Sequence, residues 1–247
     1  MPRVTDIYNF IDRIAPFSLQ EEWDNSGLLV GESKKEVKKV LVCLDCTEKT
    51  VIQAVELSCD LIISHHPIIF KAQKSFTDNN PAYLAAKNGL SVICAHTSYD
   101  VAVDGVSDTL AKTLGLKNIR KSQTGEYTMG EVNEITVFEL AKSVKEKLDS
   151  SVCFCNEEKK VKTVAVCGGA GFEFIFDAKN NGADVYITGE SDHHEFLDAL
   201  SLDIGLITAG HFETETIAVK PLKERLEKEF TDVEFILAQQ NSPIKHI

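Results

Sequence analysis

The sequence predicts an α/β protein made of two subdomains in which strands and helices alternate. Short runs of Val, Ile and Leu recur along the whole chain, and the segments between them carry apolar residues at helical spacing. Glycine, asparagine or threonine stands at many of the points where one pattern gives way to the next. Strands that are apolar along their whole length are typical of parallel sheets covered on both faces, so we expect mostly parallel sheets.

In the first half, helices and buried strands follow one another in order. Val4, Ile7 and Ile11 share one face of a first helix over residues 4–14. Thr47 is a suitable N-cap for a helix that runs to about residue 58. Gly89 and Gly115 are placed to end two further helices. Those two helices span residues 81–88 and 106–114, and the expected strands are 40–44, 61–64 and 90–95.

The second half repeats this alternation after a polar stretch at residues 117–124. That stretch suggests a boundary, so we expect one subdomain over residues 1–120 and another over residues 121–247. An antiparallel edge strand is expected near residues 127–132. The remaining expected strands are 161–166, 184–188, 204–208 and 233–237. Four helices are expected between and beside them. They are residues 136–148, a helix that ends near residue 180, a helix that carries His193 and His194, and residues 213–230.

Composition places the chain among ordinary globular proteins and excludes several classes. Of its 247 residues, 43% are hydrophobic and 26% are charged. No apolar run approaches the roughly 18 residues of a membrane span, and the N-terminus lacks the apolar core of a secretion signal. Seven scattered cysteines, several within apolar runs, favour reduced thiols and a cytoplasmic location. Cys43 and Cys46 form a CxxC without a second pair, which favours a structural role.

The formal net charge of −12 disfavours a surface that coats nucleic acid, because phosphate binding needs clustered Lys and Arg. A local basic patch stays open as an alternative. An excess of carboxylates is also compatible with the binding of divalent cations.

Potential metal ligands stand in three separate segments, each after an expected strand. His65 and His66 follow the strand 61–64, Asp100 lies just beyond the strand 90–95, and His211 precedes Glu215 by one helical turn. The carboxyl ends of parallel strands meet at one sheet edge, so these side chains could converge. Three histidines and two carboxylates are enough for a compact dinuclear site, with ions about 3.5–4 Å apart. Mixed nitrogen and oxygen ligands favour Zn, Mn, Fe, Co or Ni over Ca.

Other polar residues near these segments are candidates for catalysis. His96 and His194 could transfer protons, and Glu190, at a helix start, could orient water or substrate. Each of them is also compatible with ordinary helix capping or surface exposure. The run Gly168-Gly169-Ala170-Gly171 could bind an anion through backbone N–H groups or could form a tight structural turn.

Several motifs together resemble the Nif-three-like family, whose name stands for NGG-one-interacting factor three-like and whose members are often labelled GTP cyclohydrolase I type 2 homologues. The stretch Trp23-Asp24-Asn25-Ser26-Gly27-Leu28 fits the signature W-[DE]-N-x-G-L. The resemblance continues in order through Ser64-His65-His66-Pro67, Ala95-His96-Thr97, Thr188-Gly189-Glu190 and Gly210-His211-Phe212-Glu213-Thr214-Glu215.

This resemblance implies two subdomains of α/β/α type flanking a cleft, in one family domain. It implies a dinuclear metal site with the ligands His65, His66, Asp100, His211 and Glu215, with Glu215 as a bridge between the ions. It also implies a ring-shaped homohexamer. Longer family members carry an inserted domain, for which this chain has no room.

Three functions are compatible with these features. The first is metal-dependent hydrolysis of a nucleotide or a similar small molecule, either cyclohydrolase-like or phosphohydrolase. The second is a ring that binds DNA or RNA without turnover. The third is a regulatory protein or metal chaperone. The fold alone does not decide among them.

Overall fold

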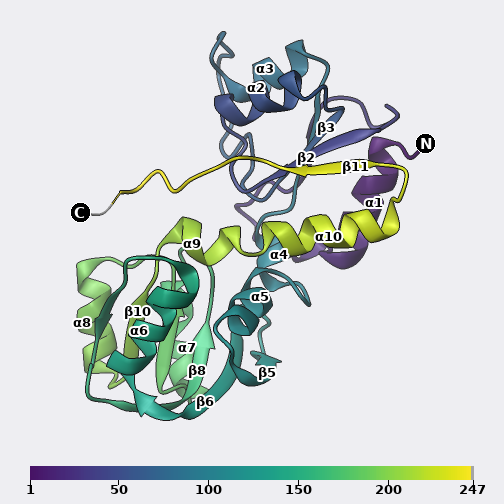
Figure 1. Cartoon of the computed structure of the whole chain (residues 1–247). Coiled ribbons are helices and arrows are strands. Elements are labelled where there is room, and N and C mark those ends of the chain that lie inside the picture. Colours follow the sequence, from purple (N-terminus) through teal and green to yellow (C-terminus); the bar gives the residue numbers. More distant parts are fainter. Residues whose placement is uncertain (246–247) are drawn as a thin grey trace. The chain divides into compact units, whose positions relative to one another are not determined.

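The computed structural model describes residues 1–245, which form two compact α/β units (Figure 1). The first unit contains Met1–Ala102 and Val219–Asn241, and the second contains Val103–Ala218 and the described residues from Ser242 onward. This division differs from the predicted boundary at residue 120. The chain crosses into the second unit at residue 103, and its last helix and strand go back to the first unit.

A five-stranded sheet with the order β1-β4-β3-β2-β11 forms the centre of the first unit. All neighbouring strands are parallel except β1, which runs antiparallel to β4. Figure 1 shows α2 and α3 on one face of this sheet and α1 and α10 on the other. The strands are β1 (Gly27–Val30), β2 (Lys39–Cys43), β3 (Leu61–Ser64), β4 (Ser91–Cys94) and β11 (Glu234–Leu237). The helices are α1 (Val4–Ile14), α2 (Glu48–Glu56), α3 (Pro81–Lys87), α4 (Thr97–Val101), α10 (Val219–Glu229) and the short 3-10 helix η1 (Phe17–Leu19).

The second unit has a six-stranded sheet with the order β5-β6-β8-β9-β10-β7. Its central strands β8, β9 and β10 are parallel, and the outer strands pair antiparallel. The strands are β5 (Lys117–Lys121), β6 (Thr128–Thr136), β7 (Cys153–Cys155), β8 (Lys160–Val166), β9 (Val185–Thr188) and β10 (Gly205–Thr208). The helices are α5 (Val106–Thr113), α6 (Val137–Leu148), η2 (Phe172–Phe174), α7 (Ile175–Asn180), α8 (His193–Ser201) and α9 (His211–Thr216).

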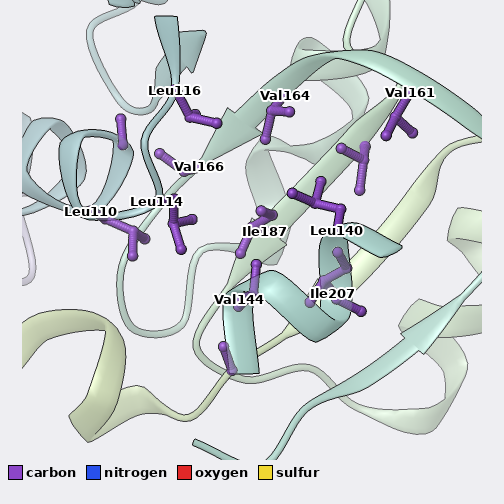
Figure 2. Close-up of a cluster of buried hydrophobic side chains, with 14 of the residues drawn as sticks. Leu110, Leu114, Leu116, Leu140, Val144, Val161, Val164, Val166, Ile187 and Ile207 are labelled. Atoms are coloured by element: carbon purple, nitrogen blue, oxygen red, sulfur yellow. The ribbon is translucent and has the colours of Figure 1, made fainter. Parts of the chain in front are cut away.

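Apolar side chains from strands and helices fill the space on both faces of this second sheet. Leu140 and Val144 of α6 pack with Ile187 and Ile207 of the central strands (Figure 2). A second cluster, which includes Tyr186 and Leu206, packs on the opposite face. Burial of apolar surface stabilises the folded state by about 25 cal/mol per Å². The packed side chains therefore hold the strand ends in fixed positions.

Several predicted helix boundaries follow from local capping. Thr47 Oγ1 accepts a hydrogen bond from the backbone N–H of Thr50 at the start of α2. Thr136 and Glu139 form a reciprocal capping box at the start of α6. Gly89 and Gly115 follow α3 and α5 with positive φ angles, as predicted for helix C-termini.

Three predicted elements differ from the structure. The polar stretch after residue 116 contains β5, whose charged side chains mark it as an edge strand. For this reason β6 is antiparallel, as expected, but is not an edge strand. The expected helix 213–230 is two helices, α9 and α10, because Pro221 has no N–H to bond to the carbonyl of Ile217. None of the helices in residues 1–245 is long and apolar enough to cross a membrane.

Candidate metal-binding site

In the first unit, histidines follow the ends of two neighbouring strands. The ladder of hydrogen bonds continues past β3, because the N–H groups of His65 and His66 donate to the carbonyls of Cys43 (3.1 Å) and Leu44 (2.9 Å). Ala95 continues β4 in the same way, by donating to Ser64 (3.0 Å), and His96 follows it. The sheet thus positions these histidines at its carboxyl edge. The predicted single sheet edge for all candidate ligands is wrong, because β10, which precedes His211, belongs to the other sheet.

His65, His66 and His96, together with Asp100 of α4, form what we call the first ligand set. One potential ligand atom of each of the three histidines lies within 4.8 Å of those of the others. His65 Nε2 lies 3.5 Å from Asp100 Oδ1. His65 is buried, with 3% of its surface exposed, and His66 is partly buried. This spacing is short enough for one cation to contact several of these atoms.

In the second unit, His211 and Glu215 form the second ligand set. The chain leaves β10 through Gly210, which has a φ of +84°, and α9 begins at His211. Their i, i+4 spacing places His211 Nε2 3.1 Å from Glu215 Oε2. Glu190, which follows β9, accepts a hydrogen bond from His211 Nδ1 at 3.0 Å. Glu190 therefore contacts the imidazole of a candidate ligand.

All four histidines of the two sets have an oxygen atom beside Nδ1. These oxygens are the carbonyl of Ala95 beside His65 (2.9 Å), Asp45 beside His66 (2.7 Å), Asp24 beside His96 (2.8 Å) and Glu190 beside His211 (3.0 Å). When the imidazole is neutral, an acceptor at Nδ1 keeps its single proton there, so that Nε2 presents a lone pair. This arrangement is typical of histidines that bind metals through Nε2.

The Asp24 carboxylate links the first ligand set to the loop before β1. It accepts hydrogen bonds from His96 Nδ1, from the N–H and hydroxyl of Thr97, from the N–H of Asn25 and from the Ser26 hydroxyl. Burial raises the pKa of a carboxyl group, but these donors outweigh it and hold the pKa of Asp24 well below its usual range. Asp24 is therefore a fixed anion that orients the His96 ring.

Glycines beneath the second ligand set allow its side chains to lie directly on the backbone. Gly169 has a φ of +64°, and a Cβ atom added there would collide with Glu215 Oε1 and lie 3.2 Å from His211 Nε2. The N–H groups of Gly169 and Gly171 donate to the hydroxyls of Thr214 and Thr188, both at 3.1 Å. These two N–H groups of the run Gly168 to Gly171 are therefore used by threonine hydroxyls within the second unit.

Electrostatics at His211 are dominated by its two carboxylate neighbours. Burial lowers the pKa of an imidazole, but hydrogen bonds and charge interactions with Glu215 and Glu190 outweigh this and raise the pKa of His211 to about 9. A neutral Nε2 lone pair and a carboxylate oxygen at 3.1 Å would repel each other. A proton or a metal cation between the two atoms removes this repulsion. An imidazole nitrogen and a carboxylate oxygen are also ligand atoms that transition-metal ions bind.

His194 is not among the candidate metal ligands of the described residues. It is exposed in the first turn of α8, so no neighbouring group within residues 1–245 holds it in a fixed orientation comparable to that of His96 or His211. Asp24 and Asp45, which orient His96 and His66, were not predicted from the sequence as functional residues. Asp45 comes shortly after an apolar strand and Asp24 lies inside the family signature, which are the signals that point to them.

The protein is thus an α/β protein of two units, and each unit has histidine and carboxylate side chains just after its strand ends. The chain belongs to the Duf34/NIF3 (NGG1p interacting factor 3) family, whose model matches residues 2–243. This confirms the family that the sequence motifs indicated.

Individual relatives match over nearly the whole chain. A Clostridium acetobutylicum protein called GTP cyclohydrolase 1 type 2 homolog is 34% identical over 241 residues, which cover 91% of this chain and 90% of that protein. A Clostridium perfringens protein of the same name is 33% identical over 256 residues, covering 96% and 97%. The crystal structure of Staphylococcus aureus protein SA1388 matches with a TM-score of 0.93 at 30% identity, covering 100% of this chain and 99% of that one.

Proposed function

We propose that this protein binds two divalent transition-metal ions through His65, His66, Asp100, His211 and Glu215 and hydrolyses a nucleotide or a similar small molecule. These five residues would hold the same pair of ions, with Glu215 as the bridge, and His96 would stay outside the ligands. The observation that carries it is the oxygen atom that lies beside Nδ1 of each proposed histidine ligand, His65, His66 and His211. That pattern fits neutral imidazoles that bind metal through Nε2.

The donor atoms favour particular ions. Imidazole nitrogens combined with carboxylate oxygens suit Zn, Mn, Fe, Co or Ni. Bound ions would polarise a substrate bond and lower the pKa of a water molecule. The gaps of 3.1 Å between His211 and Glu215 and of 3.5 Å between His65 and Asp100 support ligation, since a cation would reduce the repulsion between their acceptor atoms.

Roles follow for residues that orient the ligands. Asp24 holds Nδ1 of His96, so Nε2 is the atom of His96 that can accept or release a proton during hydrolysis. Asp45 and Glu190 hold the rings of His66 and His211 in place. His194 is exposed, and its proposed part in proton transfer would be limited to the entry or exit of protons.

The decisive experiment is elemental analysis of the purified, tag-free protein beside the variants His66→Ala and His211→Ala. We expect about two transition-metal ions per chain, and a loss of metal in each variant, since each set supplies ligands to the same pair of ions. His193→Ala, which changes an exposed histidine of α8, is the matched control and should keep its metal.

Activity is tested next, with the ion that the analysis identifies. Nucleotides would be screened for metal-dependent hydrolysis, with the chelated protein as the blank.

A protein that is metal-free and cannot be reloaded would overturn the proposal. Salt-dependent binding of DNA that survives both metal removal and His211→Ala would then favour nucleic-acid binding. Bound metal that exchanges readily, without turnover, would favour a regulatory or chaperone role.

The ring-shaped homohexamer is also part of this proposal. Light scattering of the purified protein would give the mass of the assembly directly. A mass of about six times the 27.3 kDa of one chain is expected.

A further inference from the structure

Two large aromatic side chains are exposed beside the first ligand set. Trp23 is 58% exposed and Phe70 is 46% exposed, and their ring centroids lie 5.8 Å apart at an angle of 53°. Aromatic rings of this size are usually buried, because their exposure forgoes the free energy of removing apolar surface from water. Their pairing at the surface therefore calls for an explanation.

Hydrogen bonds connect the loops that carry these two rings. The Asn25 side chain donates to the carbonyl of Ile69 at 2.6 Å, which joins the loop two residues after Trp23 to the residue that precedes Phe70. Asp24, the next residue after Trp23, is anchored by His96 and Thr97. The backbones of both loops are held in place, so the two rings are positioned before any ligand binds. Such preorganisation reduces the entropic cost of binding.

The aromatic pair is continuous with the histidines. Both rings contact His96 edge-on, with centroid distances of 5.9 Å for Trp23 and 6.1 Å for Phe70. His96 in turn contacts His65 (5.2 Å) and His66 (5.4 Å). His96 therefore lies between the candidate metal ligands and the exposed aromatic pair. A molecule that covered Trp23 and Phe70 would therefore lie beside this histidine.

We propose that Trp23 and Phe70 form a stacking surface for the planar heteroaromatic ring of the substrate, such as a purine base. This inference rests on the proposed function and adds the substrate class to it. A base covers about one ring of aromatic surface, and stacking on an aromatic side chain stabilises a bound base whatever its identity. His96 would then face the edge of the bound ring.

The size of the patch favours a small ring over a second protein chain. A stable protein interface buries about 800 Å² on each partner, which is several times the area of two side chains. Exposed charged residues flank the pair in sequence, namely Glu22 before Trp23 and Lys71 after Phe70. Such a small apolar surface with charged neighbours suits a ligand with one flat apolar face and polar edges.

Trp23 is the single tryptophan of the chain, so its fluorescence reports directly on this surface. The protein, reloaded with Zn²⁺, would be titrated with adenosine and guanosine 5′-monophosphates, with correction for light absorbed by the nucleotide. Ribose 5-phosphate is the matched control ligand, because it has the sugar and phosphate without the base. We expect saturable quenching by both nucleotides and none by ribose 5-phosphate.

Variants then test whether the aromatic pair is responsible. Phe70→Leu should weaken binding on the order of 10-fold, and Phe70→Tyr, which keeps the ring, should restore it. Phe176→Leu removes an aromatic ring that is 50% exposed in the second unit, and it should leave the affinity unchanged. Circular dichroism of each variant excludes misfolding as the cause of weaker binding.

The results also separate this inference from the proposed metal function. Intact metal binding without any quenching at millimolar nucleotide would overturn the stacking surface and leave the metal site standing. Quenching of equal affinity in Phe70→Leu and in the unmodified protein would overturn it as well. A smaller assembly in Trp23→Leu, combined with the absence of quenching, would assign this surface to contacts between copies of the chain. Quenching in a protein that cannot bind metal would retain the surface and reject the metal-dependent function.

Discussion

The Glu190 carboxylate accepts a hydrogen bond from Nδ1 of His211, with 3.0 Å between the two atoms. Glu190 follows the end of β9 and His211 follows the end of β10, so the contact depends on the parallel pairing of these two strands. A carboxylate in this position fixes the ring and increases the basicity of Nε2. The strength of metal binding should therefore depend on a residue that is not itself a proposed ligand.

Replacing Glu190 tests this dependence. Glu190→Ala should weaken metal binding about 10- to 100-fold, because loss of a partner that orients a ligating histidine has an effect of this size. Glu190→Gln should weaken it less, since the amide oxygen can still accept the Nδ1 proton. Competition with a chromogenic chelator measures both affinities. Glu173→Ala, at another exposed carboxylate of the second unit, is the control, and an equal loss there would indicate a general charge effect.

Gly169 should tolerate no side chain, because a Cβ atom would collide with the Glu215 carboxylate. Gly169→Ala is expected to displace that carboxylate and reduce bound metal, in addition to the strain of a positive φ angle. Gly182→Ala separates the two effects, since Gly182 also has a positive φ (+85°) but an added Cβ would meet nothing within 4 Å. Elemental analysis should show normal metal in Gly182→Ala. Equal metal loss in both variants would contradict the steric explanation.

Asp24 should stabilise the first unit as well as orient His96. Asp24→Asn replaces a buried anion and leaves several of its donors with a poorer acceptor, so we expect a loss of about 3 kcal/mol in the free energy of unfolding. Urea unfolding followed by the fluorescence of Trp23, the neighbouring residue, measures the change. Asp232→Asn, at an exposed position of the same unit, should change the midpoint little. Equal midpoints for Asp24→Asn and the unmodified protein would show that Asp24 has no such role.

Local patterns account for most of the elements that the sequence predicted. Thr47 caps α2 and Thr136 caps α6 through residues only three positions further along the chain, so both helix starts can be predicted from the local sequence. The buried strand Leu61–Ser64 is a continuous apolar run, so its bounds were predicted correctly. The histidines of the first unit could be predicted to converge because parallel strands end at one edge.

Elements that depend on distant partners were not predictable in the same way. β5 is polar, and only its pairing with β6 makes it a strand. β11 completes the first sheet by pairing with β2, although nearly the whole second unit separates them in sequence. Asp24 becomes significant only when folding brings it to His96, which lies 72 residues away. Sequence periodicity carries no information about such long-range pairs.

A buried polar cluster in the second unit connects α5 to the edge of the sheet. The Asp108 carboxylate accepts a hydrogen bond from the Thr128 hydroxyl (2.7 Å) and lies 3.1 Å from the ammonium group of Lys121. Burial raises the pKa of a carboxyl group, but Thr128, Lys121 and the N–H of Asp104 outweigh it, so the pKa of Asp108 is lowered from 3.8. The cluster thus stabilises the second unit through an ionised carboxylate.

This lowered pKa gives the stabilisation by Asp108 a defined pH dependence. A carboxyl group whose pKa is lower in the folded state stabilises the protein fully above its unfolded pKa, near 3.8, and loses this effect as the pH falls through the folded value. At pH 7 we therefore expect Asp108→Asn to lower the free energy of unfolding by about 2 kcal/mol, because hydrogen bonds to a charged group are lost. The difference from the unmodified protein should begin to shrink as the pH approaches 3.8 and should go on shrinking below it. Thermal unfolding followed by circular dichroism measures it, with Asp203→Asn, whose side chain is 79% exposed, as a control that should show a far smaller change. A difference that stays constant from pH 7 to pH 3 would mean that the size of the substituted side chain, and not the charge of Asp108, causes the destabilisation.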